Sequence, residues 1–318
     1  MQSDYVPCLK VYTNKIVNYA KFTGTRFHWS KPPRENKPKH KMSIKSIRNI
    51  DKYIDFLVDV SPTKWTYCKK TKKHYKYKLG FLTLTLPSSQ LTDYGQQIKS
   101  KMCTNPICQN YFTDIPNVLR HSDEQIKNIC LNQFLTELRQ VYSLKCYIWK
   151  AETQANSNIH FHIIIDKFIH WEELRNRWNR CVNKLGYVDR FAEKHDHSNP
   201  NSIDIHSIRS IKKLKQYFSK YLTKSDLSRR YVRGRVWSCS SFLSSYDGVT
   251  IPLKGLILLE YQKWTKVFKS YVFYSDYFNV WKISWDMIRN NFKNSLIAAE
   301  IEKLFLDKYG ISVKYGYG

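Results

Sequence analysis

Short apolar runs alternate with helical apolar stripes through the middle of the chain. Residues 79–86 form an apolar run that Pro87 ends, which predicts a buried strand. Residues 144–153 and 159–166 form two more apolar runs, and the polar turn between them predicts a hairpin. Residues 202–206 predict one further short strand. We therefore expect a sheet built from this part of the chain.

Three helices are predicted around these strands. Ser122 and Gln125 have the spacing of a capping box, which predicts the start of a helix that continues to about residue 141. Residues 171–185 predict a second helix and residues 208–224 a third, because apolar residues recur there at helical spacing. The apolar stripe of the first helix is expected to comprise Ile126, Ile129, Cys130, Phe134, Leu138 and Val141.

The N-terminal region has a weaker pattern. Residues 1–42 are expected to be irregular, with a basic, proline-containing arm at residues 31–41. Ser43 is a candidate cap for a helix over residues 43–58, and we expect the chain to be folded from there onward. Residues 63–78 are rich in lysine and aromatic residues and are expected to form a hairpin or a loop.

The order of elements is strand, helix, strand, strand, helix, strand and one further helix. This order predicts an α+β fold with a ferredoxin-like βαββαβ antiparallel sheet. The sheet domain would occupy residues 79–234, after a basic arm and helical extension at residues 1–78. Residues 235–318 would form a mixed extension to which the sequence assigns no role. Since this fold serves many functions, the chemistry must come from particular residues.

The charge of the chain indicates its class of partner. Lysine and arginine number 53 against 26 aspartate and glutamate residues, a formal net charge of +27. Phosphate backbones are the commonest partners of such an excess, because binding releases condensed counterions. The aromatic content of 15% favours single strands, whose bases can stack on exposed rings. Ribosome binding and an anionic membrane surface are the alternatives.

The cysteines indicate the compartment. The chain has 8 cysteines, which are scattered and form no Cys-x-x-Cys pair. This usage is typical of a reducing compartment. No apolar run in the sequence is long enough to span a bilayer. We therefore expect a cytoplasmic protein with no membrane partner.

Two histidines occupy alternate positions of the predicted strand at residues 159–166. His160 and His162 therefore project from the same face, about 6–7 Å apart along the strand, and can converge on one divalent ion. Glu152 or Gln154 falls opposite one of them if the connecting turn has an odd number of residues. A His-His-carboxylate set with open positions suits Mg²⁺ or Mn²⁺ recruited to a phosphate.

The alternative is a pair of half-buried histidines with ordinary hydrogen bonds. Two observations favour the metal site: the strand is otherwise strongly apolar, so two histidines are costly there, and a carboxylate lies on the expected partner strand. His195 and His197 form a second His-x-His, but their polar surroundings predict a solvated loop.

Two tyrosines and two lysines lie on the predicted helix at residues 208–224. Tyr217 and Tyr221 are four residues apart, at the flank of its apolar stripe, and Lys220 and Lys224 lie further toward solvent. A phenol at such a border can reach a phosphate bound on the sheet, and a nearby lysine can favour phenolate or hold the phosphate. The alternative is an amphipathic helix with boundary aromatics.

Three segments in this order resemble the three motifs of HUH-superfamily rolling-circle replication initiators. They are Phe81-Leu-Thr-Leu-Thr-Leu-Pro87, His160-Phe-His162 and Tyr217-Phe-Ser-Lys-Tyr221-Leu-Thr-Lys224. The doubled Tyr-x-x-Lys looks most like initiators of small single-stranded DNA phages and related plasmids. The likeness covers roughly residues 79–225.

The resemblance implies a metal-dependent endonuclease that acts on single-stranded DNA at a replication origin. His160, His162 and Glu152 would be the metal ligands, and Tyr217 and Tyr221 the candidate nucleophiles. The sequence holds no G-x-x-x-x-G-K-[ST] phosphate loop, so a host helicase is expected, together with a host polymerase. The host would be bacterial, with a eukaryotic host left open.

Two other functions fit the same sequence. One is a binding module of the same fold that holds single strands without metal or tyrosine chemistry. The other keeps the chemistry in a transposase or a conjugative relaxase. Arg233-Gly-Arg235-Val-Trp237 is expected either to contact DNA or to form a structural loop.

Overall fold

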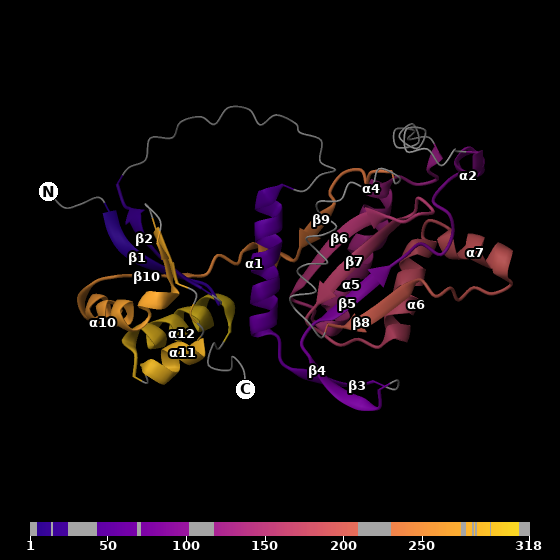
Figure 1. The fold of residues 1–318 in the computed structure, drawn as a ribbon. Helices are drawn as coiled ribbons and strands as arrows, with labels where there is room; N and C mark the ends of the chain where they lie inside the picture. The colour runs from indigo at the N-terminus through magenta and orange to yellow at the C-terminus, as the bar shows by residue number, and fades with distance from the viewer. Residues whose placement is uncertain are drawn as a thin grey trace. The chain divides into compact units, whose positions relative to one another are not determined.

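The computed structural model describes most of the chain, in two compact units (Figure 1). One unit comprises residues 1–35, 54–60 and 245–318, and the other residues 36–53 and 61–244. The described residues are 5–13, 15–24, 43–68, 71–101, 118–208, 230–274, 278–281, 283, 285–292 and 294–311.

The larger unit contains the predicted sheet. Its five strands are β5 (Gly80–Leu84), β6 (Tyr147–Thr153), β7 (Ile159–Ile165), β8 (Ile203–Ser207) and β9 (Trp237–Cys239). Their order is β8-β5-β7-β6-β9, and every pairing is antiparallel. The first four strands have the order that a ferredoxin-like βαββαβ arrangement requires, so the predicted α+β fold is confirmed.

One helical rod follows the predicted capping box. Ser122 accepts a hydrogen bond from the Gln125 backbone, and the Gln125 side chain accepts one from the Ser122 backbone, so the predicted start is confirmed. The rod consists of α4 (Asp123–Gln125), a π-helical stretch (Ile126–Leu131) and α5 (Asn132–Tyr142).

The predicted stripe of this rod is wrong at two positions. Ile129 and Val141 are exposed, whereas Leu131 and Leu135 are buried. The π-helical stretch explains the difference, because its wider turn changes the angle between successive side chains that a regular 3.6-residue period assumes.

Other helices of this unit flank the sheet. α6 (Trp171–Asn183) was predicted, and it ends before Gly186, which has a left-handed backbone conformation. α7 (Tyr187–His195) was not predicted, because the apolar residues of so short a helix give little periodicity. α2 (Asp93–Lys101) also lies in this unit.

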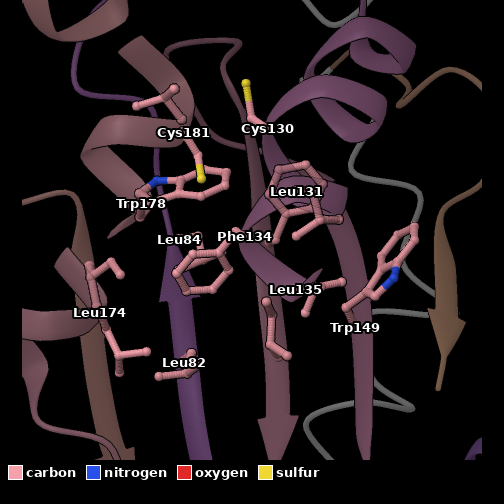
Figure 2. Close-up of a cluster of buried hydrophobic side chains, with 14 of the residues drawn as sticks. Leu82, Leu84, Cys130, Leu131, Phe134, Leu135, Trp149, Leu174, Trp178 and Cys181 are labelled. Atoms are coloured by element: carbon pink, nitrogen blue, oxygen red, sulfur yellow. The ribbon is translucent and has the colours of Figure 1, made fainter. Parts of the chain in front are cut away.

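The core of this unit lies on one face of the sheet. Figure 2 shows Leu82 and Leu84 of β5 and Trp149 of β6 beside side chains of the two helical segments. Phe161 and Ile163 of β7 belong to the same cluster. The helical side chains that cover them are Cys130, Leu131, Phe134, Leu135, Leu174, Trp178 and Cys181. Since strand residues alternate, His160 and His162 lie on the opposite face.

The smaller unit corrects the prediction that residues 1–42 are irregular. β1 (Tyr5–Val11) and β2 (Ile16–Phe22) pair with each other, and with strands from the far end of the chain. Those strands are β10 (Val249–Pro252) and β12 (Phe278–Trp281), followed in the sheet by β11 (Val272–Tyr274). Partners so distant in sequence leave no local signal, so the two termini build one sheet that no local pattern indicates.

Helices complete the smaller unit. They are α10 (Gly255–Val267), α11 (Trp285–Asn291), α12 (Leu296–Tyr309) and the last turns of α1 (Ile44–Val60). Buried aromatic rings of the unit include Phe56, Tyr246 and Trp264. The predicted helix at residues 43–58 is therefore confirmed, with Ser43 accepting a hydrogen bond from the Ser46 backbone.

Short elements account for the rest of the described secondary structure. β3 (Lys64–Cys68) and β4 (Lys73–Tyr77) form a separate two-stranded hairpin in the larger unit. α9 (Ser241–Ser244) and a 3-10 turn (Lys269–Tyr271) are single turns. No helix within the described ranges is both long and apolar enough to cross a bilayer.

A buried ion pair ties four loops of the larger unit together. The Arg230 guanidinium donates to both carboxylate oxygens of Asp123, at 2.7 and 2.8 Å, and both side chains are buried. Arg230 also donates to the Gln90 side chain at 2.9 Å and to the Ser157 carbonyl at 2.8 Å. The Gln90 side chain in turn accepts from the Ile159 backbone at 2.8 Å. This network fixes the turn between β6 and β7 to the helical rod.

The same network sets the charge state of Asp123. Burial alone would raise the pKa of this carboxyl, but the hydrogen bonds and positive charge of Arg230 outweigh it, with help from the Arg233 backbone and Gln90. The pKa of Asp123 is therefore lowered from its ordinary value of 3.8. The pair is ionised at neutral pH and its donors and acceptors are matched.

Asp123→Asn should lower the free energy of unfolding by about 3–5 kcal/mol, because it leaves the Arg230 guanidinium buried beside a neutral group. The control is Asp93→Asn, since Asp93 pairs with Arg120 at an exposed position and its loss should cost less than about 1 kcal/mol. Urea denaturation at neutral pH measures both. Equal effects of the two substitutions would contradict the role assigned to the buried pair.

The penalty of Asp123→Asn should also depend on pH. A carboxyl whose pKa is lowered by folding contributes its full stabilisation above its unfolded-state pKa and loses it as the pH falls through the folded-state value. The stability of the variant and of the unaltered protein should therefore converge below about pH 3.8. A gap as large in acid as at neutral pH would refute this assignment.

Candidate metal centre

The register of β6 and β7 brings one carboxylate and two imidazoles together. Glu152 pairs directly with His160, and Lys150 with His162, across a turn at residues 154–158. The odd-numbered turn expected from the sequence is therefore present, and it selects Glu152 rather than Gln154 as the residue opposite a histidine. All four paired side chains project from the face of the sheet that is opposite the core.

Three donor atoms converge at this point. The Glu152 Oε1 atom lies 2.9 Å from His160 Nε2 and 2.6 Å from His162 Nε2. The two Nε2 atoms are 2.9 Å apart. Both histidines are buried, and Glu152 is half-buried. The three residues thus offer one ligand atom each, all within 4.8 Å of one another.

The electrostatics keep these donors in the forms that bind a cation. Burial would raise the pKa of Glu152, but hydrogen bonds with His160 and His162 and the charge of Lys150 hold it far below its usual range. Burial lowers the pKa of His162 and outweighs its hydrogen bond with Glu152, which acts in the opposite direction. A carboxylate and a neutral imidazole are therefore available at neutral pH.

β5 supports the ring of His162 from the other side. Thr83 pairs with His162 in the sheet, and its Oγ1 atom lies 3.2 Å from His162 Nδ1. A proton on Nδ1 shared with Thr83 leaves the Nε2 lone pair directed at the cluster. The Phe81 ring stacks on the His162 ring, with centroids 5.4 Å apart and planes 21° apart. The first strand of the sheet thereby fixes the orientation of one candidate ligand.

Lys150 supports Glu152 in the same way. Its Nζ atom donates to Glu152 Oε2 at 3.2 Å, which leaves Oε1 for the histidines. Lys150 is itself buried, and burial lowers the pKa of its ammonium, against the attraction of Glu152. We did not predict this residue, although its position two residues before Glu152 on the same strand face was a usable signal.

The donor set fits a small divalent cation. Ligands about 2.1 Å from an octahedral ion are separated by about 3 Å, which is close to the separations within the cluster. The His160 Nδ1 atom is buried and has no hydrogen-bond partner among the residues that the structure describes. Hydrogen bonding within the protein therefore leaves this histidine incompletely satisfied, as expected if its role is directed through Nε2.

The candidate tyrosines lie outside the described residues. Tyr217, Lys220, Tyr221 and Lys224 all fall within residues 209–229. The ends of the segment are placed at opposite ends of β7. The Ile208 backbone donates to the Leu79 carbonyl, beside the end of β7 at Ile165. Arg230 is bound to Thr153 and Ser157 beside the start of β7, next to His160.

Two other predicted features have structural surroundings. His195 ends α7 and His197 follows it, both exposed and both beside the Phe191 ring. The backbone of Arg233 and Arg235 is held by Lys127, which donates to both carbonyl oxygens. The segment with these arginines therefore has a structural role through its backbone, and both arginine residues are exposed.

The sequence resembles one known family over part of its length. Residues 80–226 match the family model of the replication-associated protein ORF2, which covers somewhat less than half of the chain. The matched segment begins with β5 and includes the metal cluster and both tyrosines. No curated protein and no solved structure matches the chain. Over this segment the chain resembles proteins of DNA replication, and DNA is the partner that the resemblance implies.

Proposed function

We propose that this chain is an HUH-type rolling-circle replication initiator, which nicks single-stranded origin DNA and rejoins it through a tyrosine. The observation that carries the proposal is the convergence of Glu152, His160 and His162, because this donor set suits a divalent ion beside a phosphate. The match of residues 80–226 to replication-associated proteins supports the biological setting.

The proposed metal is Mg²⁺ or Mn²⁺, held by Glu152, His160 and His162. When bound, it would polarise the scissile phosphate and stabilise the charge that develops in the transition state. Three protein donors leave coordination positions for phosphate oxygens and water. Thr83 and Lys150 orient two of the three ligands before any ion binds, which lowers the cost of assembling the site.

The proposed reaction exchanges one phosphoester bond for another. The phenolic oxygen of Tyr217 or Tyr221 forms a bond to phosphorus, and the bond from phosphorus to the 3′ oxygen of the preceding nucleotide breaks. The phenol gives up its proton and the departing oxygen gains one, so the products are a 5′-phosphotyrosyl link and a free 3′-hydroxyl. Lys220 or Lys224 would favour the phenolate or hold the DNA phosphate.

The free 3′-hydroxyl suits extension by a host polymerase, with a host helicase as the proposed source of unwinding. Attack of a later 3′-hydroxyl on the phosphotyrosyl link reverses the first step and rejoins the strand. A second tyrosine allows a second transfer before the first link is resolved. We place the reaction in the cytoplasm of a host cell.

A binding module without catalysis is the second candidate. The net charge of +27 supports it as well as the first. Burial of two histidines and a carboxylate at one point favours the enzyme, because binding of DNA by charge and stacking needs no such cluster. A transposase or relaxase would share the chemistry and differ in its DNA substrate.

His160→Ala should weaken Mn²⁺ binding by more than about 100-fold, because a direct ligand matters more than a residue that only orients one. Isothermal titration of the purified protein with Mn²⁺ measures the affinity. The control is a His195→Ala, His197→Ala double variant, which should bind Mn²⁺ normally because those histidines are exposed and outside the cluster. Unchanged affinity in His160→Ala would remove the metal assignment.

Thr83→Val should weaken Mn²⁺ binding by about tenfold, since it removes the hydrogen bond to His162 Nδ1 while preserving the shape of the side chain. Thr85→Val is the matched control, because Thr85 lies just beyond the same strand but donates to the Ser202 carbonyl. Both variants are titrated in the same way. Equal affinities of the two would show that Thr83 has no positioning role.

Tyr217→Phe together with Tyr221→Phe should abolish a covalent protein–DNA adduct, because no phenolic nucleophile remains in the motif. The substrate is a labelled pool of single-stranded oligonucleotides that covers the origin of the replicon encoding the chain, with Mn²⁺, and the readout is intact mass. The single variants identify the tyrosine that attacks first. Tyr94→Phe, at an exposed position on α2, is the control.

Full cleavage by the double variant would overturn the tyrosine mechanism. Absence of any adduct from the unaltered protein on its own origin DNA, with oligonucleotide binding intact, would favour the binding module instead.

A further inference from the structure

The hairpin of β3 and β4 has an unusual composition. Of the sixteen residues from 63 to 78, seven are lysine and four are aromatic, and none is acidic. The hairpin is a sheet of only two strands, separate from the five-stranded sheet. A two-stranded hairpin is marginally stable by itself, so its anchoring and its free face need separate explanations.

The inner side of the hairpin explains how it is held. Tyr77 is buried, and Lys64, which pairs with it, donates to the Lys78 carbonyl at 2.8 Å and to the Asp166 carbonyl at 2.6 Å. Burial lowers the pKa of Lys64, against the attraction of Asp166. Asp166 directly follows β7, so the hairpin is fixed to the end of the strand that carries His160 and His162.

The outer side of the hairpin carries aromatic rings and cations together. Trp65 pairs with Lys76 and Tyr67 with His74, and alternation places all four on one face. The Trp65 residue is 61% exposed and Tyr67 is 51% exposed. Lys76 Nζ lies 5.2 Å from the centre of the Trp65 ring, and the Tyr67 and His74 rings are 5.1 Å apart. We call these four residues the hairpin platform.

Exposed rings in this arrangement are costly unless a ligand covers them. Trp65 and Tyr67 lie two residues apart along one strand, about 6–7 Å, so both rings face solvent in a row. A stretch with seven lysines and no acidic residue fits a polyanion. Bases of a single strand can stack on such rings whatever their sequence, while lysines neutralise the phosphates; the bases of a duplex are already stacked on each other.

We propose that the hairpin platform is a binding site for single-stranded DNA, separate from the metal cluster. The source of the strand rests on the proposed function, whereas the stacking and charge argument does not. An anionic membrane fits the charge too, but two rings offer little apolar area for insertion. The platform would hold a part of the strand away from the bond that is cleaved.

The test measures the affinity of the full-length protein for a fluorescent oligothymidine by anisotropy, with EDTA present so that no cleavage occurs. Trp65→Ala and Tyr67→Ala should each weaken binding at least about fivefold, because each ring stacks one base. Trp65→Phe should keep most of the affinity. Phe273→Ala is the matched control, since Phe273 is 60% exposed on strand β11 of the other unit, and it should leave the affinity unchanged.

The charge contribution is tested with Lys76→Gln. This variant should bind more weakly and should reduce the slope of log affinity against log salt by about one, as expected for one lost phosphate contact. The exposed lysine Lys266 on α10 supplies the control Lys266→Gln, which should leave both the affinity and the slope unchanged.

Three outcomes would overturn the proposal. They are unchanged affinity in the Trp65→Ala, Tyr67→Ala double variant with an unaltered melting temperature; an equal loss on a duplex of the same length; and loss of binding to phosphatidylserine vesicles alone. The adduct measurement separates this proposal from the proposed function. Ring-dependent binding by a protein that never forms an adduct would support the platform and remove the nuclease.

Discussion

The antiparallel register of β6 and β7 is the constraint on which the candidate site depends. It places Glu152 opposite His160 and Lys150 opposite His162, and a slip of one residue would turn the side chains of the slipped strand toward the core. The polar groups do not hold this register by themselves. It is held by the other face of the same strands, where apolar side chains such as Phe161 pack against two helices. Apolar burial on one side of the sheet therefore builds the polar cluster on the other.

The cluster is hard to explain as a device for stability. Removing ionisable groups from water costs several kcal/mol for each ion, and their mutual attraction repays this cost only in part. Burial lowers the pKa of Lys150 and of His162, while the pKa of Glu152 is held far below its usual range. Such opposed shifts at one point are typical of functional sites. By contrast, the Asp123–Arg230 pair is matched to its surroundings and joins loops.

Much of the larger unit could be predicted because its signals are local. Strand alternation gave the shared face of His160 and His162, and a turn of odd length selected Glu152. The rest depends on partners that are distant in sequence or on irregular backbone. β1 pairs with β10 across more than two hundred residues, and a π-helical turn exposes Ile129. The residues 81–87 gave only a weak pattern, because the role of this strand lies in its contacts: its side chains stack on and hydrogen-bond to the ring of His162.

β7 links three features that the sequence presents separately. The metal cluster lies near its start, at His160, whereas the hairpin is fixed beyond its end through Asp166. The chain enters the tyrosine segment near that end, at Ile208, and leaves it near the start, at Arg230. A strand of seven residues is about 23 Å long, so a DNA strand held on the hairpin platform and at the cluster would follow the length of β7. Under this proposal stacking and cleavage occur at opposite ends of one rigid element, which allows the hairpin to hold DNA without crowding the reacting phosphate.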